Sequence, residues 1–520
     1  MPITRRELLE RAAALGMTMS ILPALGCKPE ETTGEDGFPL YQWDGPLGPF
    51  TTFEHGVASG DPLLDAVLLW TRVSPPPGAA SVELFLEVSR APDFATRLAV
   101  GTFTTTADRD WTLTVDQTEL EPGTTYYYRF SALGRTSPIG RTRTLPAGPT
   151  DRFRFAACAC SNYGAAYFHL YRHIAQRADL DLVLHLGDYI YEHASAGEGF
   201  SYGVLRPLDP PNEILTLDDY RRRYGCYRRD PDLQELHRQH PMSHCWDDHE
   251  FADNPRADGS ANHQEDEGSW PDRVAAALQA YGEWMPSRLD GNRIYRELAL
   301  GDLARLVFTD RQRKFLWPEP DDGAAYLGAA QTAWLKATVA TVTEPWLVLC
   351  TATSFTSRLP PGEEASDFDG SPWDPASRRE VLDAVATAGV QNLVVLMGDI
   401  HKAQALDVSD DPDAYDPATG AGSEGVELAT GSIGSPGLPM STEGVPHFLW
   451  SEEAFRTWLL VDLTPTAMHA EHWGIPDAAK LTWELPEEVL VKAWRCDAGS
   501  HHLVEVSEAT APPERPGLAP

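Results

Sequence analysis

Three short apolar runs in this chain stop at an aspartate that lies beside histidine or tyrosine. They span residues 179–192, 244–250 and 392–401. Runs this short and this rich in branched side chains are typical of buried strands. Because a glycine lets the backbone turn just before two of the aspartates, we expect Asp188 and Asp399 at the carboxyl ends of their strands. Ligands bind at that edge of open α/β sheets.

The pattern before residue 147 is different. Short alternating segments, separated by proline and glycine turns, occupy residues 67–73, 82–88, 111–115 and 126–132. This spacing is typical of a β-sandwich, and residues 120–128 resemble the start of a fibronectin type III strand. Later in the chain, strands alternate with helix-like stretches, beginning with a strand at 153–157 and a helix at 165–178. We therefore expect a β-sandwich followed by an α/β layered domain.

Composition supports a large protein with several cores. The chain has 520 residues, of which 42% are hydrophobic and 23% charged, so it is long enough for more than one domain. Its formal net charge of −35 argues against nucleic acid as a partner, because phosphates would repel it. The seven cysteines are few and irregularly spaced, which excludes a disulfide framework.

The first thirty residues differ from the rest. Arg5 and Arg6 precede an apolar stretch, residues 12–26, that is too short and too weakly hydrophobic to span a bilayer. This pattern is typical of a twin-arginine export signal, which implies the twin-arginine machinery as a partner and an exported, periplasmic or cell-surface protein. Cys27 stands where a lipoprotein signal would be acylated, and lipidation and simple cleavage nearby both remain open. Residues 31–50 are predicted to form a linker.

The strand ends indicate a metal site. Clustered carboxylates, imidazoles and phenols would repel one another or stay poorly solvated unless a cation held them. Asp188 and Tyr191 would share a face if the chain turned into a helix after the strand. Cys160 adds a thiolate from the loop after the first strand, whereas Cys158 fits a small buried residue. A carboxylate, a phenolate and a thiolate together favour a hard trivalent ion such as ferric iron.

Six motifs occur in an order that resembles a known family. They are GVASGDP at 56–62, CSNY at 160–163, HLGDYIYE at 185–192, WDDHE at 246–250, TDRQ at 309–312 and GDIH at 398–401. Over about residues 53–474 the chain resembles the alkaline phosphatase D family, the PhoD-like phosphatases and phosphodiesterases.

The resemblance implies an α/β fold in two parts. An N-terminal fibronectin III/Ig-like β-sandwich, residues 51–146, would precede a metallophosphoesterase α/β sandwich of two sheets flanked by helices, residues 150–480. Residues 481–520 would form a C-terminal extension.

The resemblance also implies Fe³⁺ and Ca²⁺ as cofactors. Four residues would hold the iron, namely Cys160, Asp188, Tyr191 and His401. Asp188 would bridge to the calcium, which Asp399 and Asn254 would also bind. Asp248 is the rival to Asn254, by analogy with the Gly-Asn-His motif of other metallophosphoesterases. After His401, residues 402–404 depart from the family pattern, which puts the substrate preference in doubt.

Phosphate ester chemistry assigns roles to two more residues. Two cations can bridge a hydroxide and neutralise the phosphate oxygens for in-line displacement. His249 would then protonate the leaving oxygen or steady the transition state, unless it caps a helix. Arg311 would clamp a phosphate oxygen through its planar fork, unless it pairs with Asp310 or another acid in the wall.

These inferences predict an exported phosphomonoesterase or phosphodiesterase. A phospholipase D-type phosphodiesterase is the nearest alternative among enzymes. A catalytically inert cell-surface binding protein is the alternative outside them. The pattern does not choose among monoesters, diesters, lipids and teichoic-acid polymers as the substrate.

Overall fold

The computed structural model describes residues 33–195, 205–320, 325–358, 372–411, 413–437 and 444–520. The predicted export signal and Cys27 lie outside the described residues. Residues 1–41 form one unit, of which the described part holds a bridge between Thr33 and Pro39, and residues 42–520 form another. Within the described ranges, no helix combines the length and the apolar character that crossing a membrane needs.

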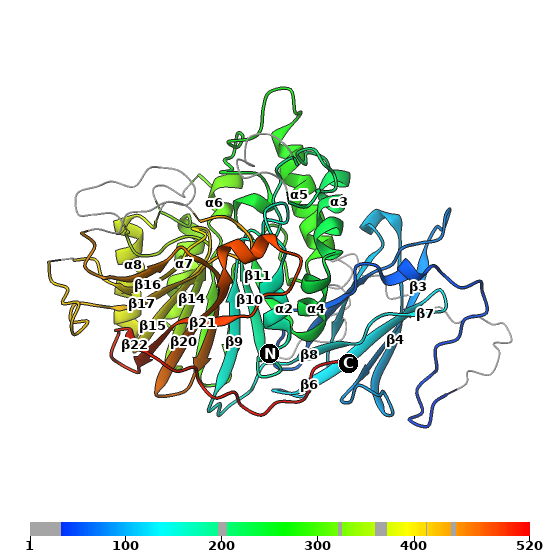
Figure 1. Ribbon diagram of the computed structural model, residues 1–520, viewed down its shortest axis with the longest axis horizontal. Coiled ribbons are helices and arrows are strands. Elements are labelled where there is room, and N and C mark those ends of the chain that lie inside the picture. The colour runs from blue at the N-terminus through cyan, green and yellow to red at the C-terminus, as the bar shows by residue number, and fades with distance from the viewer. Residues whose placement is uncertain (1–32, 196–204, 321–324, 359–371, 412, 438–443) are drawn as a thin grey trace. The chain divides into compact units, whose positions relative to one another are not determined.

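The larger unit is built on a ten-stranded sheet (Figure 1). Neighbours β9, β10, β11 and β1 run parallel, and the remaining neighbours are antiparallel. In spatial order the strands are β22 (Val504–Val506), β21 (Val489–Asp497), β20 (Ala467–Pro476), β19 (Phe455–Leu463), β9 (Phe153–Cys158), β10 (Leu182–Leu186), β11 (Pro241–Cys245), β1 (Val57–Gly60), β2 (Val67–Arg72) and β5 (Thr112–Gln117).

A seven-stranded sheet packs against it. Strands β13, β14, β15 and β17 are parallel, as expected for fully buried and mainly apolar runs such as β15. The order is β12 (Arg296–Leu300), β13 (Ala304–Phe308), β14 (Trp346–Thr351), β15 (Asn392–Met397), β17 (Gly425–Thr430), β16 (Ala403–Val408) and β18 (Phe448–Glu452). Leu184 of one sheet and Val348 and Leu396 of the other share one buried cluster, so the two sheets form a sandwich.

Helices cover the outer faces of both sheets. Against the ten-stranded sheet lie α2 (His169–Ala175), α3 (Leu217–Arg228), α4 (Pro231–Gln239) and α5 (Trp270–Trp284). Against the seven-stranded sheet lie α7 (Ala329–Val339) and α8 (Pro375–Ala388), and α6 (Gln312–Leu316) follows β13. Short 3₁₀ turns are η1 (Phe50–Phe53), η2 (Ala107–Arg109), η3 (Asp248–Glu250) and η4 (Asp477–Leu481). Side-chain caps begin two of these helices, since α3 opens with a Thr216–Asp219 capping box and α5 with Ser269.

The predicted N-terminal β-sandwich is present. Its second sheet has the order β4 (Arg97–Thr105), β3 (Val82–Ser89), β6 (Thr125–Ala132) and β7 (Arg135–Thr136), with β8 (Gly140–Arg143) also paired to β6. Its core joins Leu69 of β2 and Val115 of β5 to Leu84 of β3 and Phe130 of β6. Because β1, β2 and β5 are also the edge of the ten-stranded sheet, the sandwich and the α/β part share one continuous sheet.

Two local predictions differ from the structure. The helix expected at 165–178 is confined to α2, because residues 163–165 form a turn and residues 166–168 are irregular ahead of the helix. Residues 481–520, predicted as an extension, contribute β21 and β22 to the ten-stranded sheet. The chain then returns to the N-terminal sandwich, where the Tyr127 hydroxyl donates to the Gly517 carbonyl at 2.6 Å. The domain boundaries themselves stay a prediction.

Candidate metal centre

The predicted metal ligands follow the ends of four strands. Cys160 lies after β9, Asp188 after β10, Asp248 after β11, and Asp399 and His401 after β15. Because β9, β10 and β11 are parallel neighbours, their carboxyl ends meet at one edge of the ten-stranded sheet. The end of β15 reaches that edge from the facing sheet, since Gly398 packs against Ala159 and Leu186 with no room for a side chain.

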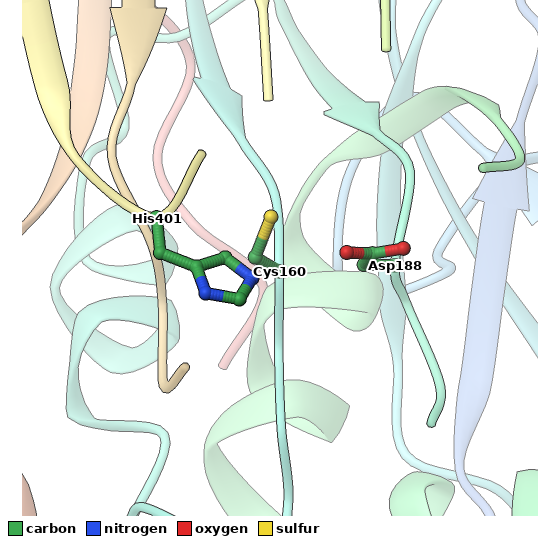
Figure 2. Close-up of side chains that lie close together, drawn as sticks. All are labelled: Cys160, Asp188 and His401. Atoms are coloured by element: carbon green, nitrogen blue, oxygen red, sulfur yellow. The ribbon is translucent and has the colours of Figure 1, made fainter. Parts of the chain in front are cut away.

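Cys160, Asp188 and His401 form the centre of the cluster. Their candidate ligand atoms all lie within 4.8 Å of one another, a separation suited to one metal ion. Figure 2 shows the three side chains coming from three separate segments of the chain. Residues more than two hundred positions apart are thus brought to one point by the two-sheet fold.

Tyr191 joins this cluster by a different route from the one predicted. Residues 188–191 form a bend rather than a helix. The Tyr191 hydroxyl nevertheless donates to Asp188 Oδ2 at 3.0 Å and lies 3.1 Å from Nε2 of His401. The Ser435 hydroxyl donates to the same phenol oxygen at 2.7 Å. The bend therefore places the phenol among the other candidate ligands.

Backbone conformation marks the same residues. Five predicted ligands have left-handed φ values: Cys160 (61°), Asp188 (57°), Asn254 (51°), Asp399 (60°) and His401 (57°). Such values are uncommon outside glycine and cost about 1–3 kcal/mol each in unfavourable cases. A gathering of them at one sheet edge is typical of a functional site, where the surrounding fold imposes a conformation that the chain alone would avoid.

The rivals Asp248 and Asn254 lie side by side. The backbone N–H of Asn254 donates to Asp248 Oδ2 at 3.0 Å. Ligand atoms of Asp188, Asp248 and His249 also lie within 4.8 Å of one another. The structure thus brings both candidates to the cluster and leaves the choice between them open.

Two buried oxygens in the cluster have no hydrogen-bond partner in the described structure. They are Oδ1 of Asp188 and Oδ1 of Asn254. A buried polar atom without a partner is costly, and a cation is one way to satisfy it. The set of donors, a thiol, carboxylates, an amide oxygen, a phenol and an imidazole, is also one that metal ions accept. The residues present therefore fit a metal centre.

Electrostatics agree with this fit. Burial raises the pKa of Cys160 well above its usual value, and the carboxylates of Asp188 and Asp399 raise it further. Burial likewise raises the pKa of Asp188 and the pKa of Tyr191. A bound cation would oppose these shifts and favour the anionic forms of the three groups as ligands.

His249 has a buried partner to which the sequence assigned no role. Nδ1 of His249 lies 2.7 Å from Oε2 of Glu192 and donates to it. The other oxygen of Glu192 accepts from the Asp253 amide at 2.7 Å and from Asn262 at 2.6 Å. Glu192 is the last residue of the motif at 185–192. Its position in that motif, rather than its residue type, could have pointed to a role in the site. The carboxylate fixes the orientation of the imidazole and leaves Nε2 available.

The charge of His249 follows from its neighbours. Burial opposes a proton on the ring, but the carboxylates of Asp248, Glu192 and Asp188 outweigh burial and raise the pKa of His249 well above its usual value. The ring lies in the η3 turn and bonds to a side chain, so it does not act as the helix cap that was its alternative role.

Two further residues hold the loops in place. Glu250 accepts from the backbone amides of Asp188 at 3.1 Å and Asp247 at 2.7 Å. Arg456 donates to the carbonyls of His401 at 3.1 Å and Ser435 at 2.8 Å. No local sequence signal pointed to Arg456, because it lies 55 residues from His401 along the chain.

His401 is oriented by its own loop. Its Nδ1 donates to the Pro436 carbonyl at 2.8 Å, which leaves Nε2 facing Tyr191. Burial lowers the pKa of His401 to about 3, so the ring is neutral and can donate an electron pair to a metal.

Arg311 lies at the start of α6, just after β13. Its guanidinium carbon is 4.8 Å from the ring centroid of Phe315 and 4.7 Å from that of Tyr326. Asp310, its alternative partner, accepts instead from the Trp246 indole at 2.8 Å and the Arg313 amide at 3.0 Å. The role of Arg311 toward phosphate stays a prediction.

The six cysteines in the described ranges are free and buried. Cys158 lies in the core, where its thiol is 3.5 Å from the Leu184 carbonyl, as expected for a small packing residue. Cys160 alone among them contributes to a candidate metal group in those ranges.

Comparison with known proteins agrees with the fold and the site. The family model described as PhoD-like phosphatase matches residues 155–471, and the model of the PhoD-like phosphatase N-terminal domain matches residues 49–146. Alkaline phosphatase D of Bacillus subtilis (strain 168) is 30% identical over 510 residues, covering 91% of this chain and 84% of that protein. A solved structure titled "Structure of PhoD" superimposes with a TM-score of 0.80 at 30% identity, covering 90% of this chain and 94% of that one.

The fold and these matches define the protein first as a phosphoric ester hydrolase. The chain belongs to the PhoD-like phosphatase family. The predicted fold class, a β-sandwich followed by a two-sheet α/β sandwich, is confirmed with it.

Proposed function

We propose that this protein is an exported, metal-dependent phosphomonoesterase or phosphodiesterase of the alkaline phosphatase D type. The observation that carries the proposal is the cluster of Cys160, Asp188 and His401, whose ligand atoms lie within 4.8 Å of one another. Among proteins of this family, such a cluster has a direct use, since phosphate esters resist attack until their negative oxygens are neutralised.

The ligand assignment follows the donors. Cys160, Asp188, Tyr191 and His401 would hold Fe³⁺, and Asp188, Asp399 and either Asn254 or Asp248 would hold Ca²⁺. The thiol and the phenol suit the trivalent ion, whereas the carboxylates and the amide oxygen suit calcium. When bound, the two ions would supply Lewis acidity toward the phosphate and lower the pKa of the attacking water.

His249 would supply the proton for the leaving oxygen. Glu192 accepts from Nδ1, so Nε2 is the nitrogen that can face the substrate. Cations held by Asp188 and Asp248 would offset the charge of the carboxylates that raise the pKa of His249. The pKa of His249 would then fall toward neutral pH. A general acid works best when its pKa lies near the working pH.

The hydrolysis proposal is tested with two esters. Purified protein is assayed on p-nitrophenyl phosphate and bis-p-nitrophenyl phosphate, with and without added calcium. We expect calcium-dependent hydrolysis of at least one ester. Failure on both after iron and calcium are restored would favour an inert binding protein instead.

Export is tested separately. A twin-arginine signal needs both arginines of its motif, so Arg5→Lys combined with Arg6→Lys should retain the protein in the cytoplasm. Undiminished export of that double variant would contradict the twin-arginine route. Labelling with a radioactive fatty acid, compared between wild type and Cys27→Ala, decides between lipidation of Cys27 and simple cleavage.

A further inference from the structure

Arg358 is a buried cation at the same sheet edge as the candidate metal centre. It follows β14, whose parallel neighbours β13 and β15 lead to Arg311 and Asp399. Phe308, Cys350 and Leu396 are in register across these strands. Because parallel strands end together, the loop that carries Arg358 emerges between the loops that carry Arg311 and Asp399.

Within the described ranges, no carboxylate lies in direct contact with the positive charge of Arg358. Only 4% of the residue is exposed, and its one hydrogen bond in the described ranges runs from Nη1 to Oε1 of Gln404 at 3.5 Å. No carboxylate forms an ion pair with it in those ranges. A buried arginine normally binds an anion or several acceptors, because its charge is costly to desolvate.

Glu427, the carboxylate whose charge acts most strongly on Arg358, is already engaged. Glu427 accepts from the Ser354 hydroxyl and the Phe355 amide, each at 3.0 Å, and from the Thr356 amide at 2.7 Å. These bonds hold the loop after β14. Burial lowers the pKa of Arg358, and the charges of Glu427 and Asp399 only partly oppose that effect.

Tyr326 packs against Arg311 and also acts electrostatically on Arg358. The Arg311 guanidinium lies 4.7 Å from the centroid of the Tyr326 ring. The Tyr326 hydroxyl lies 2.5 Å from the hydroxyl of Thr353, in the loop that leads to Arg358. The Tyr326 ring in turn stacks on Trp373 at 4.8 Å. These packed rings give the basic side of the edge a fixed support, which favours an anion held in one orientation.

We infer that Arg358 binds a terminal phosphate oxygen of the substrate and thereby favours monoesters over diesters. The inference rests on the proposed function and deepens it. A monoester carries three terminal oxygens, whereas a diester carries two. An arginine beyond the metal ligands therefore has an additional anionic oxygen to bind in a monoester.

The test is Arg358→Gln, compared with wild type in the metal-loaded protein. Calorimetry with inorganic phosphate should show a Kd raised about tenfold or more, as expected for a lost charged hydrogen bond. The KM for p-nitrophenyl phosphate should rise by a similar factor, and that for bis-p-nitrophenyl phosphate by less than about threefold. Iron and calcium contents should stay unchanged, because Arg358 is not a ligand.

Arg358→Lys and Arg379→Gln complete the design. The lysine variant keeps a charge and should recover part of the phosphate affinity, and it replaces Arg358→Gln if that variant does not fold. The Arg379 side chain, on α8, is 38% exposed and pairs with Glu424. Arg379→Gln should therefore leave the phosphate Kd and the KM for p-nitrophenyl phosphate unchanged.

The two failures are distinguishable. An unchanged phosphate Kd in Arg358→Gln, or equal losses on both esters, would overturn the inference while ester hydrolysis by wild type still supports the proposed function. A metal-loaded wild type that hydrolyses neither ester would overturn the proposed function and the inference that rests on it.

Discussion

The loops at the ends of the two sheets differ in the charge they carry. The parallel strands β9, β10 and β11 lead to anionic or ionisable donors, Cys160, Asp188 and Asp248. In the facing sheet, β13 and β14 lead to the cations Arg311 and Arg358, and β15 leads to the candidate metal ligands Asp399 and His401. One side of the edge is therefore suited to cations and the other to an anion.

This difference explains how one edge can serve both metal and phosphate. A phosphate ester must be approached by positive charge from more than one direction, because its terminal oxygens point apart. Metal ions on the first side and guanidinium groups on the second would meet that need. Substitutions on the two sides should accordingly have different signatures, and the first side should show the larger effects.

The largest effect is expected on the donor side, for Asp188→Asn. Asp188 belongs to two of the three candidate metal groups in the described ranges, so loss of its charge should release metal and lower kcat by about a thousandfold or more. Elemental analysis and kinetics on the purified variant measure the two effects. The exposed Asp65, which also lies beside a strand end, gives a matched Asp65→Asn control. Retained metal with full activity in Asp188→Asn would contradict the assignment.

A smaller effect is expected for Glu192→Gln. The glutamine can no longer accept from His249 with a charged oxygen, so proton delivery should weaken and kcat should fall about 10–100-fold. The loss should be greater for an alkyl phosphate than for p-nitrophenyl phosphate, because a poor leaving group needs the proton more. Glu265→Gln, at an exposed site, is the control. Equal losses on both substrates would argue against a general acid.

On the basic side, Arg311→Gln should act on binding. We expect KM for p-nitrophenyl phosphate to rise about tenfold with a smaller change in kcat, since Gln cannot form the two-pronged contact. Arg311→Lys should restore part of the affinity. If KM and phosphate affinity stay at wild-type values, the packing of Arg311 on Phe315 and Tyr326 is its whole role.

The smallest effect concerns stability. Burial raises the pKa of Asp310 to about 7, above its value in the unfolded chain, so the folded state binds this proton more tightly. Its contribution to stability is therefore complete below about pH 4 and is lost as the pH rises through 7. Asp310→Asn should flatten this dependence.

The measurement for Asp310 is the melting temperature of both proteins between pH 4 and 8. The difference between variant and wild type should move by about 2 °C in favour of the variant toward pH 8. A difference that does not change with pH would show that Asp310 titrates at its ordinary value.

The sequence could predict where several candidate ligands lie, because they follow short strands. The runs at β10, β11 and β15 fixed where Asp188, Asp248 and His401 would emerge. The bend after Asp188 was not predictable, because the spacing to Tyr191 fits a helix equally well. The left-handed conformations of Cys160 and His401 had no glycine to signal them either.

Charge partners from distant segments were the main omission. Arg358 and Arg456 sit in no recognisable motif, and their roles depend on which loops the two sheets bring together. Two histidines illustrate the same limit. His185 lies on β10 and His244 on β11, the strands that lead to Asp188 and Asp248. Both are buried in the core, and burial lowers the pKa of each to about 3, whereas carboxylate neighbours do the opposite for His249.

The sequence predicted the fold class but not which distant strands pair with one another. Local alternation indicated the N-terminal strands, but pairing of β1 with β11, Ser59 opposite Pro241, joins segments far apart in the chain. Strands β21 and β22 were missed because their residues are mostly partly exposed and lack a fully apolar run.

The most direct test of the central claim is the metal content of wild type and Cys160→Ala, measured together with hydrolysis of the two nitrophenyl esters. We predict about one iron per wild-type chain, calcium-dependent hydrolysis, and loss of both iron and activity in the variant. Full iron content and full activity in Cys160→Ala, or a wild type that is active without iron, would contradict the account.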